Sequence, residues 1–329
     1  MTRRLVVDLA REGPAWKIPP SSIQAVRDAL GPGWEVVEAE AGDPTAAHGA
    51  EVYFSYTLSR GVLEAARPTL RWVHSGMAGV AGSLALLAGT GIVLTNSAGI
   101  HADPIADWAI AGIAYFARSL DRMRDAQRQH RWTRPQFAAL EIPVAELRDL
   151  RVGVFGLGGL GSAIARRALA LGMSVAGVRR RPDRGGPPGV RWVGGMGDLA
   201  RLAAESDCLV IAAPHTNETA GAVNGDILGR LPAGAMVVNV SRGSLLVEAD
   251  LLAALDRGAL RGAALDVFAT EPLPPEHPFW DHPRVLVSPH AAAVTSRYWE
   301  RETGLMLENI RRYLARQPLV NVVDQEAGY

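Results

Sequence analysis

The fold of this 329-residue chain is decided by the stretch Gly156-Leu157-Gly158-Gly159-Leu160-Gly161. The apolar run Val152-Gly153-Val154-Phe155 comes directly before it, and Ser162-Ala163-Ile164-Ala165 opens a helical pattern directly after it. A G-x-G-x-x-G pattern between a strand and a helix is the fingerprint of a dinucleotide-binding turn. In a chain with 35 glycines the pattern by itself is weak evidence for a dinucleotide site, but its position between a strand and a helix makes the evidence stronger.

The three glycines of the G-x-G-x-x-G pattern each have a physical role. Gly156 makes the tight turn, Gly158 lets the main chain approach a pyrophosphate, and Gly161 lets the helix and the strand pack closely. The helix N-terminus then faces the phosphates. We therefore predict that Gly156, Gly158, Gly159, Leu160 and Gly161 bind the cofactor, the alternative being a plain strand-to-helix turn with incidental glycines.

The next strand indicates which dinucleotide binds. In sites that prefer NAD, an acidic residue roughly 20 positions further on accepts hydrogen bonds from the ribose 2′-hydroxyl. Here the 20 residues after the loop contain no acidic residue, and the strand ends in Arg179, Arg180 and Arg181. Arginine binds a 2′-phosphate through charge-assisted hydrogen bonds. The arginines favour NADP over NAD, although a solvated basic turn with Asp183 reaching back to the ribose stays open.

The composition excludes several classes of protein. Lys+Arg and Asp+Glu balance at 34 each, so no net field is available to hold nucleic acid or an anionic membrane. Cys208 is the only cysteine, which rules out an intrachain disulfide and a cysteine metal cluster, and no metal site is predicted. No apolar stretch reaches the roughly 18 residues of a membrane span, and the start lacks a signal peptide. We expect a reduced, cytoplasmic protein whose partner is a small molecule.

Short apolar runs alternate with longer Ala/Leu-rich stretches of helical character. This alternation predicts parallel sheets that are built from right-handed crossovers. The predicted strands are residues 5–7, 35–37, 52–54, 72–73, 93–95, 152–155, 174–178, 191–193, 209–211, 236–238 and 285–287.

Helices or turns are predicted over residues 22–30 and 61–66. One long, mostly apolar helix is predicted over residues 105–121, with Asp103 as its N-cap and Pro104 at its first position. The stretch from Arg179 to Gly195 is rich in Arg, Gly and Pro and predicts an exposed loop.

Three further motifs follow the glycine loop. They are Asn239-Val240-Ser241-Arg242-Gly243, then Leu265 to Pro274 with the sequence LDVFATEPLP, then Ser288-Pro289-His290. They resemble the Asn-x-x-Arg-Gly segment, the Leu-Asp-Val-Phe…Glu-Pro signature and the Pro-His element of the D-isomer-specific 2-hydroxyacid dehydrogenases. The glycine loop and these three motifs follow one another along the chain in the same order as in that family. The resemblance is weaker in Ser75–Val80, Thr95-Asn96 and the C-terminal helix.

The chemistry of 2-keto acid reduction accounts for the residue types in these motifs. The reaction needs a hydride donor, a proton for the carbonyl oxygen and a cation for the carboxylate. His290 suits proton transfer because imidazole titrates near neutral pH, and a hydrogen bond from the ring to Glu271 would orient it. Arg242 can bind the carboxylate and polarise the carbonyl. We predict that these three residues are catalytic, and the resemblance implies the same roles.

Each catalytic prediction has a structural alternative. Arg242 could lie in a surface turn, Glu271 could be a loop carboxylate, and His290 could stand at the entry to a helix.

The resemblance implies further contacts with cofactor and substrate. Asp266 is similar to the residue that holds the nicotinamide carboxamide, and Pro214 and Val240 are predicted to contact the cofactor. The loop Ser75–Val80 resembles the family loop whose backbone amides meet the substrate carboxylate. We predict that this loop binds substrate through Met77, Ala78 and Gly79, together with Arg242 and His290.

The resemblance implies an α/β fold with two doubly wound parallel-sheet domains. A Rossmann-type cofactor domain, residues 102–290, would be inserted into a flavodoxin-like substrate domain, residues 1–101 plus 291–329, with a cleft between the two. Homodimers are usual in this family.

The expected reaction is the reduction of glyoxylate, hydroxypyruvate or a similar short 2-keto acid with NADPH or NADH. One alternative is oxidation of D-3-phosphoglycerate, which would need further cations. Another is a dinucleotide-sensing co-regulator without turnover, which the presence of Arg242, Glu271 and His290 disfavours.

Overall fold

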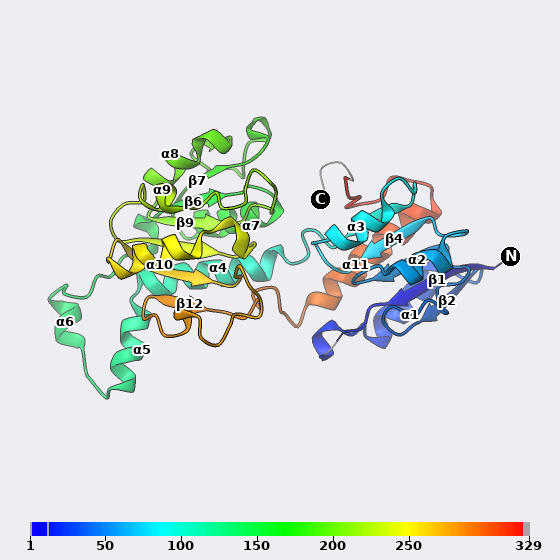
Figure 1. Ribbon diagram of the computed structural model, residues 1–329, viewed down its shortest axis with the longest axis horizontal. Helices are drawn as coiled ribbons and strands as arrows, with labels where there is room; N and C mark the ends of the chain where they lie inside the picture. Colours follow the sequence, from blue (N-terminus) through cyan, green and yellow to red (C-terminus); the bar gives the residue numbers. More distant parts are fainter. Residues whose placement is uncertain (1, 12, 325–329) are drawn as a thin grey trace. The chain divides into compact units, whose positions relative to one another are not determined.

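The computed structural model describes residues 2–11 and 13–324, in two compact units (Figure 1). Met1–His101 and Val294–Tyr329 form one unit, and Ala102–Ala293 form the other. The first is named here the five-stranded unit and the second the seven-stranded unit, after their sheets. Residues 291–293 fall in the seven-stranded unit, three residues beyond the expected boundary. The physical reason is that the amides of Ala291 and Ala292 donate to the side chain of Asp266 in that unit.

The five-stranded unit contains one parallel sheet with the order β2-β1-β3-β4-β5. Its strands are β1 (Arg3–Asp8), β2 (Trp34–Glu38), β3 (Val52–Ser55), β4 (Trp72–Ser75) and β5 (Val93–Asn96). Its helices are α1 (Pro20–Leu30), α2 (Arg60–Ala66), α3 (Ala81–Leu87) and α11 (Tyr298–Leu314), with the short 3-10 helix η1 (Pro14–Trp16).

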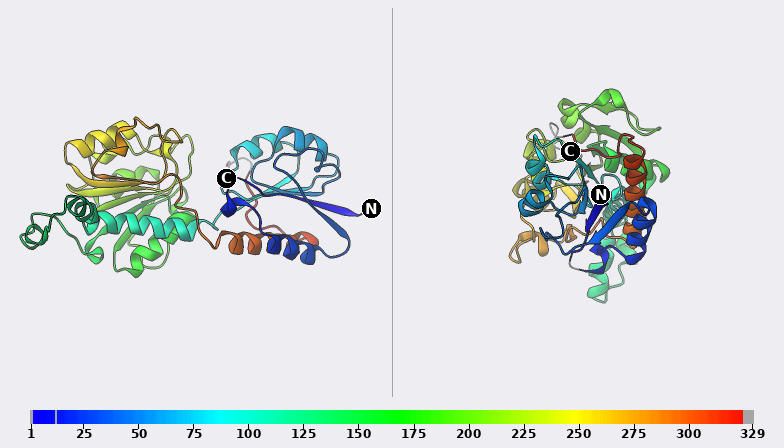
Figure 2. Two further views of the ribbon diagram at one scale, coloured as in Figure 1. Left: turned by 90° about the horizontal axis from the view of Figure 1, so that it is seen from below. Right: turned by 90° about the vertical axis from the view of Figure 1, so that its right-hand side faces the viewer.

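Helices cover both faces of this sheet (Figure 2). Side chains alternate along a strand, so neighbouring residues of β1 enter different cores. Leu5 and Val7 pack in the core that α1 and α11 cover, whereas Val6 packs in the core that α2 and α3 cover. Burial on both faces explains why these strands are nearly continuous apolar runs in the sequence.

The seven-stranded unit contains a parallel sheet with the order β12-β11-β10-β9-β6-β7-β8. Its strands are β6 (Arg151–Phe155), β7 (Ser174–Val178), β8 (Val193–Gly194), β9 (Cys208–Ile211), β10 (Ala235–Asn239), β11 (Leu260–Leu265) and β12 (Val285–Val287). One face packs against α4 (Ala102–Ala117) and α7 (Gly159–Ala170), and the other against α8 (Leu199–Ala204), α9 (Gly225–Leu228) and α10 (Glu248–Asp256). The prediction of two doubly wound parallel sheets is confirmed.

The strand order reverses next to β6. The chain proceeds from β6 to β7 and β8 on one side and then crosses to β9 on the other side. Loops at the carboxyl ends of β6 and β9 therefore diverge, and ligands of open parallel sheets bind in the crevice that such loops form. The glycine loop follows β6 directly.

Two strand predictions need correction. Of the strand predicted over 191–193, only Val193 belongs to β8, although Arg191 and Trp192 also form backbone hydrogen bonds with β7. The strand β11 was not predicted, since Arg261, Gly262 and alanines have low strand propensity. These small residues are needed because α4 packs closely here: a Cβ at Gly262 would lie 2.4 Å from the ring of Phe116.

The helix predicted over 105–121 is also wrong in its bounds. The helix α4 starts at Ala102, so Asp103 lies in its first turn and is not the N-cap. It ends at Ala117, and Ser119 adopts a left-handed φ of 52° before α5 (Leu120–Arg128) begins. Polar contacts fix this break: Arg261 donates to the hydroxyl of Ser119 at 3.0 Å and to the buried carboxylate of Asp121 at 2.6 Å.

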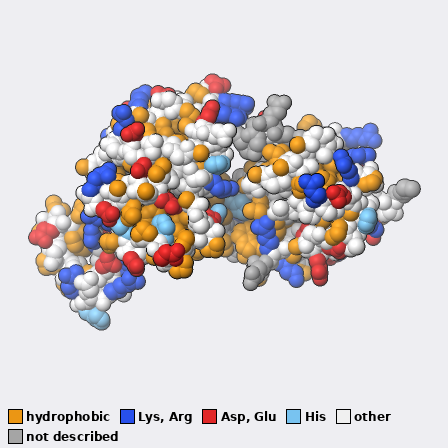
Figure 3. Space-filling view, in the orientation of Figure 1, with side chains coloured by type: hydrophobic (Ala, Val, Ile, Leu, Met, Phe, Trp, Pro, Cys, Tyr) orange, Lys and Arg blue, Asp and Glu red, His pale blue; other side chains and the backbone are white. Residues whose placement is uncertain are grey.

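Beyond this break, α5 and α6 (Arg134–Ala138) project from the seven-stranded sheet (Figures 1 and 2). We call residues 120–143 the arm. Several of its large apolar side chains are exposed, above all Trp132, which is 85% exposed, and Leu140, which is 79% exposed. Figure 3 shows apolar side chains mixed with charged ones over this part of the surface. An exposed tryptophan of this kind is unusual on a surface that faces only water.

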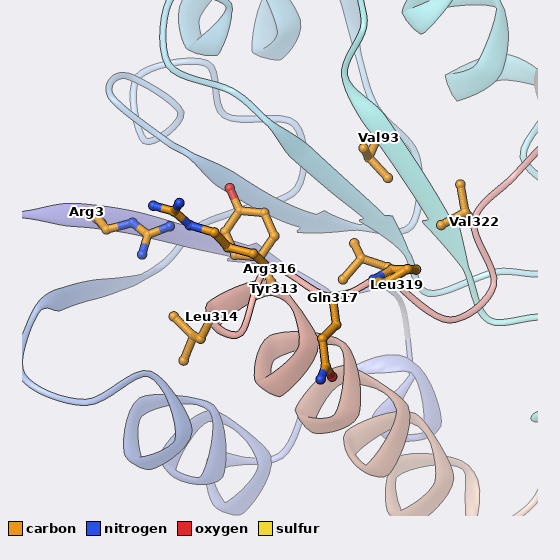
Figure 4. A pocket seen from close by; sticks show the side chains of 9 residues that line it. Arg3, Val93, Tyr313, Leu314, Arg316, Gln317, Leu319 and Val322 are labelled. Carbon is orange, nitrogen blue, oxygen red and sulfur yellow. The ribbon is translucent and has the colours of Figure 1, made fainter.

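A pocket of about 650 Å³ lies in the five-stranded unit at the end of α11 (Figure 4). Arg3 and Val93, the first residues of β1 and β5, line it together with Tyr313. It therefore lies at the amino-terminal edge of the sheet, opposite the edge where ligands of parallel sheets bind. The Arg3 guanidinium is paired with Glu51.

None of the helices in residues 2–11 and 13–324 is long and apolar enough to span a membrane.

Candidate active site

The glycine loop joins β6 to α7, as predicted, with the helix starting at Gly159 and not at Ser162. Gly156 has a φ of +105°, and a Cβ there would lie 2.4 Å from the main chain of Ala213. A Cβ at Gly161 would lie 2.0 Å from the carbonyl oxygen of Gly156. Main-chain atoms therefore contact both positions. A larger residue at Gly156 would displace the loop after β9, and one at Gly161 would push α7 away from the turn after β6.

The middle of the loop is different, because Gly158 and Gly159 have no heavy atom within 4 Å of an added Cβ. Leu160 turns its side chain into the core, while its amide belongs to the first turn of α7. First-turn amides have no acceptor within a helix, and the helix dipole there attracts an anion. The loop therefore has both the space and the donors that a pyrophosphate requires, and these residues fit a dinucleotide.

The three arginines follow β7 but have different surroundings. Arg179 is half-buried, and its guanidinium donates to the carbonyl of Gly185 at 2.7 Å, which closes the loop that follows. Arg180 and Arg181 are exposed. The first arginine thus has a role within the protein, and the other two present charge at the surface beside the carboxyl end of β7.

The loops after β9 and β10 adjoin the glycine loop. Ala213 contacts Gly156, as described, and its carbonyl accepts a hydrogen bond from the hydroxyl of Ser241. Pro214 follows Ala213, and Val240 is buried, with its amide donating to the carbonyl at the end of β9. The predicted cofactor residues Pro214 and Val240 therefore lie at the same edge of the sheet as the glycine loop.

Arg242 follows β10 in a turn that Asn239 shapes. The Asn239 side chain accepts from the amide of Ser241 at 3.2 Å and donates to the carbonyl of Arg242 at 3.1 Å. Asn239 was not among the predicted site residues, although the Asn-x-x-Arg-Gly motif contains it. The side chain of Arg242 is exposed. A Cβ at Gly243 would lie 1.8 Å from the carbonyl carbon of Phe268, so this turn lies directly on the loop after β11.

Glu271 and His290 form a hydrogen-bonded pair. The imidazole Nδ1 lies 2.7 Å from Glu271 Oε2, and Glu271 Oε1 accepts from the amide of Phe268 at 2.9 Å. The side chains of His290 and Glu271 are 49% and 34% exposed. With Nδ1–H donating to the carboxylate, Nε2 is left for another partner. His290 does not enter a helix, because α11 begins only at Tyr298.

Asp266 lies between the ends of β11 and β12 and is 3% exposed. Its Oδ1 accepts from the hydroxyl of Ser288 at 2.6 Å and from the amides of Ala291 at 2.8 Å and Ala292 at 3.1 Å. Burial raises the pKa of the Asp266 carboxyl, while these hydrogen bonds lower it. The structure thus shows Asp266 bound to the turn that contains His290, a contact that the sequence analysis missed.

The predicted substrate residues Met77, Ala78 and Gly79 lie in the five-stranded unit, after β4. Met77 is partly buried, and Ala78 and Gly79 are exposed. Asn96, at the end of β5, donates from its side chain to the carbonyl of Ala78 at 2.9 Å and so fixes the loop. Arg242, Glu271 and His290 lie in the seven-stranded unit.

Other histidines have different environments. His74 is fully buried between Thr95 and Glu302, which makes it part of the core of its unit. His215, after β9, is exposed and lies 2.8 Å from the hydroxyl of Ser244. Within residues 2–11 and 13–324, no three or more His, Cys, Asp or Glu side chains converge as metal ligands.

A parallel sheet with a glycine loop at its switch point, and a histidine–carboxylate pair at the same edge, defines the class of NAD(P)-binding oxidoreductases. Residues 110–292 match the family model described as "D-isomer specific 2-hydroxyacid dehydrogenase, NAD binding domain". The chain belongs to the D-isomer-specific 2-hydroxyacid dehydrogenase family, whose members are NAD(P)-dependent enzymes.

Solved structures of similar proteins match this chain over nearly its whole length. A D-isomer-specific 2-hydroxyacid dehydrogenase from Xanthobacter autotrophicus Py2, in complex with NADPH and MES, is 31% identical with a TM-score of 0.81, and the match covers 100% of both chains. An NADPH-dependent glyoxylate/hydroxypyruvate reductase from Sinorhizobium meliloti, in complex with NADP and sulfate, is 29% identical with a TM-score of 0.79. That match covers 99% of this chain and 100% of the reductase.

Proposed function

We propose that this protein reduces a short 2-keto acid, of the glyoxylate or hydroxypyruvate type, to the D-2-hydroxy acid with NADPH. The observation that carries the proposal is the Glu271–His290 pair, at 2.7 Å, on the same sheet edge as the glycine loop. The likeness to a glyoxylate/hydroxypyruvate reductase supports this choice of substrate.

The division of roles follows from the chemistry of each side chain. A bound nicotinamide supplies hydride to C2 of the keto acid. His290, protonated, donates a proton from Nε2 to the carbonyl oxygen, so that the C=O bond becomes C–OH. Glu271 accepts a hydrogen bond from Nδ1 and so holds the ring in position. Arg242 binds the substrate carboxylate and polarises the carbonyl, and Asp266 holds the carboxamide.

The five-stranded unit is proposed to be the substrate domain. Backbone amides at Met77, Ala78 and Gly79 would meet the substrate carboxylate. The seven-stranded unit would serve as the cofactor domain.

The preference for NADPH rests on Arg180 and Arg181, because arginine pairs with a 2′-phosphate. Two similar proteins that were solved with NADPH or NADP, from Xanthobacter autotrophicus and Sinorhizobium meliloti, support it. Arg179 contributes chiefly by closing the loop through Gly185.

Absorbance at 340 nm tests the proposal. Purified protein is assayed with glyoxylate, hydroxypyruvate, pyruvate and larger 2-keto acids, with NADPH and NADH in turn. The expected result is highest kcat/KM for a two- or three-carbon acid with NADPH. Turnover limited to larger or phosphorylated acids would overturn the substrate proposal, and equal use of NADH would overturn the cofactor proposal.

We also propose that the protein is a cytoplasmic homodimer whose contact includes the arm. The support is the exposure of Trp132 and Leu140, which a second copy would cover. Light scattering after size exclusion should give a dimer for the wild type and a monomer for Trp132→Ser with Leu140→Gln. A dimer unchanged by both substitutions would exclude the arm as the contact.

A further inference from the structure

We propose that Ser288 is a positioning residue for the reaction: its hydroxyl, bound to Asp266, fixes the turn from which His290 presents its imidazole. The inference rests on the proposed role of His290 as proton donor. It assigns a function to a residue that neither the motifs nor the resemblance singled out beyond its place before Pro289.

The turn after β12 is wrapped around one carboxylate oxygen. Asp266 Oδ1 accepts from Ser288 on one side of His290, and from Ala291 and Ala292 on the other side. Only Pro289 and His290 lie between these donors, and proline has no N–H to add. The three hydrogen bonds therefore fix both ends of a two-residue segment that contains the histidine.

The segment needs such fixing because His290 has a φ of 54°. A residue with a side chain is strained in this left-handed region, so it stays there only where its surroundings impose the conformation. The amide of His290 also donates to the carbonyl of Ser288 at 3.0 Å, which closes the turn. From this conformation the imidazole reaches Glu271 at 2.7 Å.

Ser288 donates one of the hydrogen bonds that favour the ionised form of Asp266. Burial is the largest influence on Asp266 and raises the pKa of its carboxyl, and the hydrogen bond from Ser288 is the strongest influence that lowers it. Removing the hydroxyl favours protonation of Asp266, and a neutral carboxyl accepts more weakly from the amides of Ala291 and Ala292. The turn would then lose the side-chain hydrogen bond before His290 and keep weaker ones after it.

The serine acts only through Asp266. Its own amide donates to the carbonyl of Leu265 at 2.9 Å, so the backbone at Ser288 stays paired with β11 whatever its side chain is. Substituting the side chain therefore tests the hydroxyl without removing the strand contact. Ser288→Ala removes the hydroxyl, and Ser288→Thr keeps it.

Ser206→Ala is the matched control. Ser206 is a buried serine of the same unit, and its hydroxyl donates to the carbonyl of Leu202 away from the carboxyl edge of the sheet. Two readouts are taken on all three variants. One is kcat with glyoxylate and NADPH, beside the NADPH dissociation constant from fluorescence. The other is hydrogen exchange of the peptide that covers residues 288–293, which does not depend on turnover.

We expect Ser288→Ala to lower kcat about tenfold with the NADPH dissociation constant within about twofold, since a misdirected proton donor slows chemistry more than cofactor binding. Amides 291 and 292 should exchange about tenfold faster. Ser288→Thr should recover most of kcat, and Ser206→Ala should match the wild type.

An unchanged kcat in Ser288→Ala would overturn the proposal, as would an equal loss in Ser288→Ala and Ser288→Thr. If the wild type reduces no 2-keto acid at all, the proposed function is wrong. Hydrogen exchange of residues 288–293 then tests by itself whether the Ser288 hydroxyl holds the turn. Unchanged hydrogen exchange in Ser288→Ala would show that the hydroxyl does not hold the turn.

Discussion

A buried histidine–glutamate pair and an exposed one have nearly the same nitrogen–oxygen distance. In the five-stranded unit, His74 Nε2 lies 2.8 Å from Glu302, and both side chains are 0% exposed. In the seven-stranded unit, His290 Nδ1 lies 2.7 Å from Glu271, and these side chains are 49% and 34% exposed. The pairs differ in what surrounds them and in which polar atoms remain available.

The remaining polar atoms separate the two roles. In the buried pair, the second nitrogen of His74 is bound to Thr95 and the second oxygen of Glu302 to Ser97, so no polar atom of the pair is left for a ligand. In the exposed pair, Glu271 uses its second oxygen to hold the main chain of Phe268, while the half-exposed side chain of His290 keeps Nε2 for a ligand. The first arrangement stabilises a core, and the second can exchange a proton with a substrate.

The largest effect on turnover is expected at His290. His290→Asn removes the proton donor and should lower kcat on the order of a thousandfold, within the range of general acid catalysis. The midpoint of urea unfolding should change little, because the side chain is half exposed. Steady-state assays with glyoxylate and NADPH measure the first, and fluorescence measures the second. A kcat near that of the wild type would end the distinction between the two pairs.

Arg242 should have the next largest effect. Arg242→Gln removes the cation for the substrate carboxylate, so kcat/KM should fall on the order of a hundredfold, mainly through KM. Arg230→Gln is the control, because this exposed arginine precedes β10 at the opposite edge of the sheet. Equal kinetics in both variants would remove Arg242 from the site.

The arginines after β7 should change the choice of cofactor more than the rate. In the double variant Arg180→Ser with Arg181→Ser, the ratio of kcat/KM with NADPH to that with NADH should fall about tenfold or more, since the 2′-phosphate loses its charged partners. Arg184→Ser, on the 3-10 helix η3 (Pro182–Arg184), is the control. A ratio that stays constant would assign the preference to other residues.

The buried pair should show the smallest effect on turnover. His74→Asn leaves the carboxylate of Glu302 buried without its imidazole, which should cost about 3 kcal/mol of unfolding free energy, while kcat of the folded protein stays within about twofold of the wild type. Urea unfolding and the absorbance assay measure both quantities on one preparation. A loss of kcat comparable to that of His290→Asn would give His74 a part in catalysis.

Much of the fold could be predicted because strands buried on both faces are apolar runs. The exceptions have local causes. The strand β11 contains Gly262 and Ala264 because α4 packs closely on it, and a Cβ at Gly112 of α4 would lie 2.8 Å from Ala264. Close packing between elements therefore removed the bulky residues on which a strand prediction depends. The break at Ser119 depends on Arg261, which is 142 positions away in the sequence.

The motifs predicted which residues belong to the candidate site, but they did not predict the hydrogen bonds that hold those residues in place. The family-like motifs and the chemistry of the side chains indicated Arg242, Glu271 and His290, but the hydrogen bonds that hold them come from residues whose roles no single motif reveals. Ser288 and Asn239 are ordinary polar residues in the sequence, and only the fold shows that they bind Asp266 and the turn of Arg242.

A double-mutant cycle on kcat, with glyoxylate and NADPH, tests most directly the claim that Glu271 acts through His290. Glu271→Gln alone should lower kcat about tenfold to a hundredfold, because the ring loses its charged partner. Groups that act as one unit are not additive, so Glu271→Gln combined with His290→Asn should be no slower than His290→Asn alone. A double variant slowed by the full product of the two single effects would contradict the account.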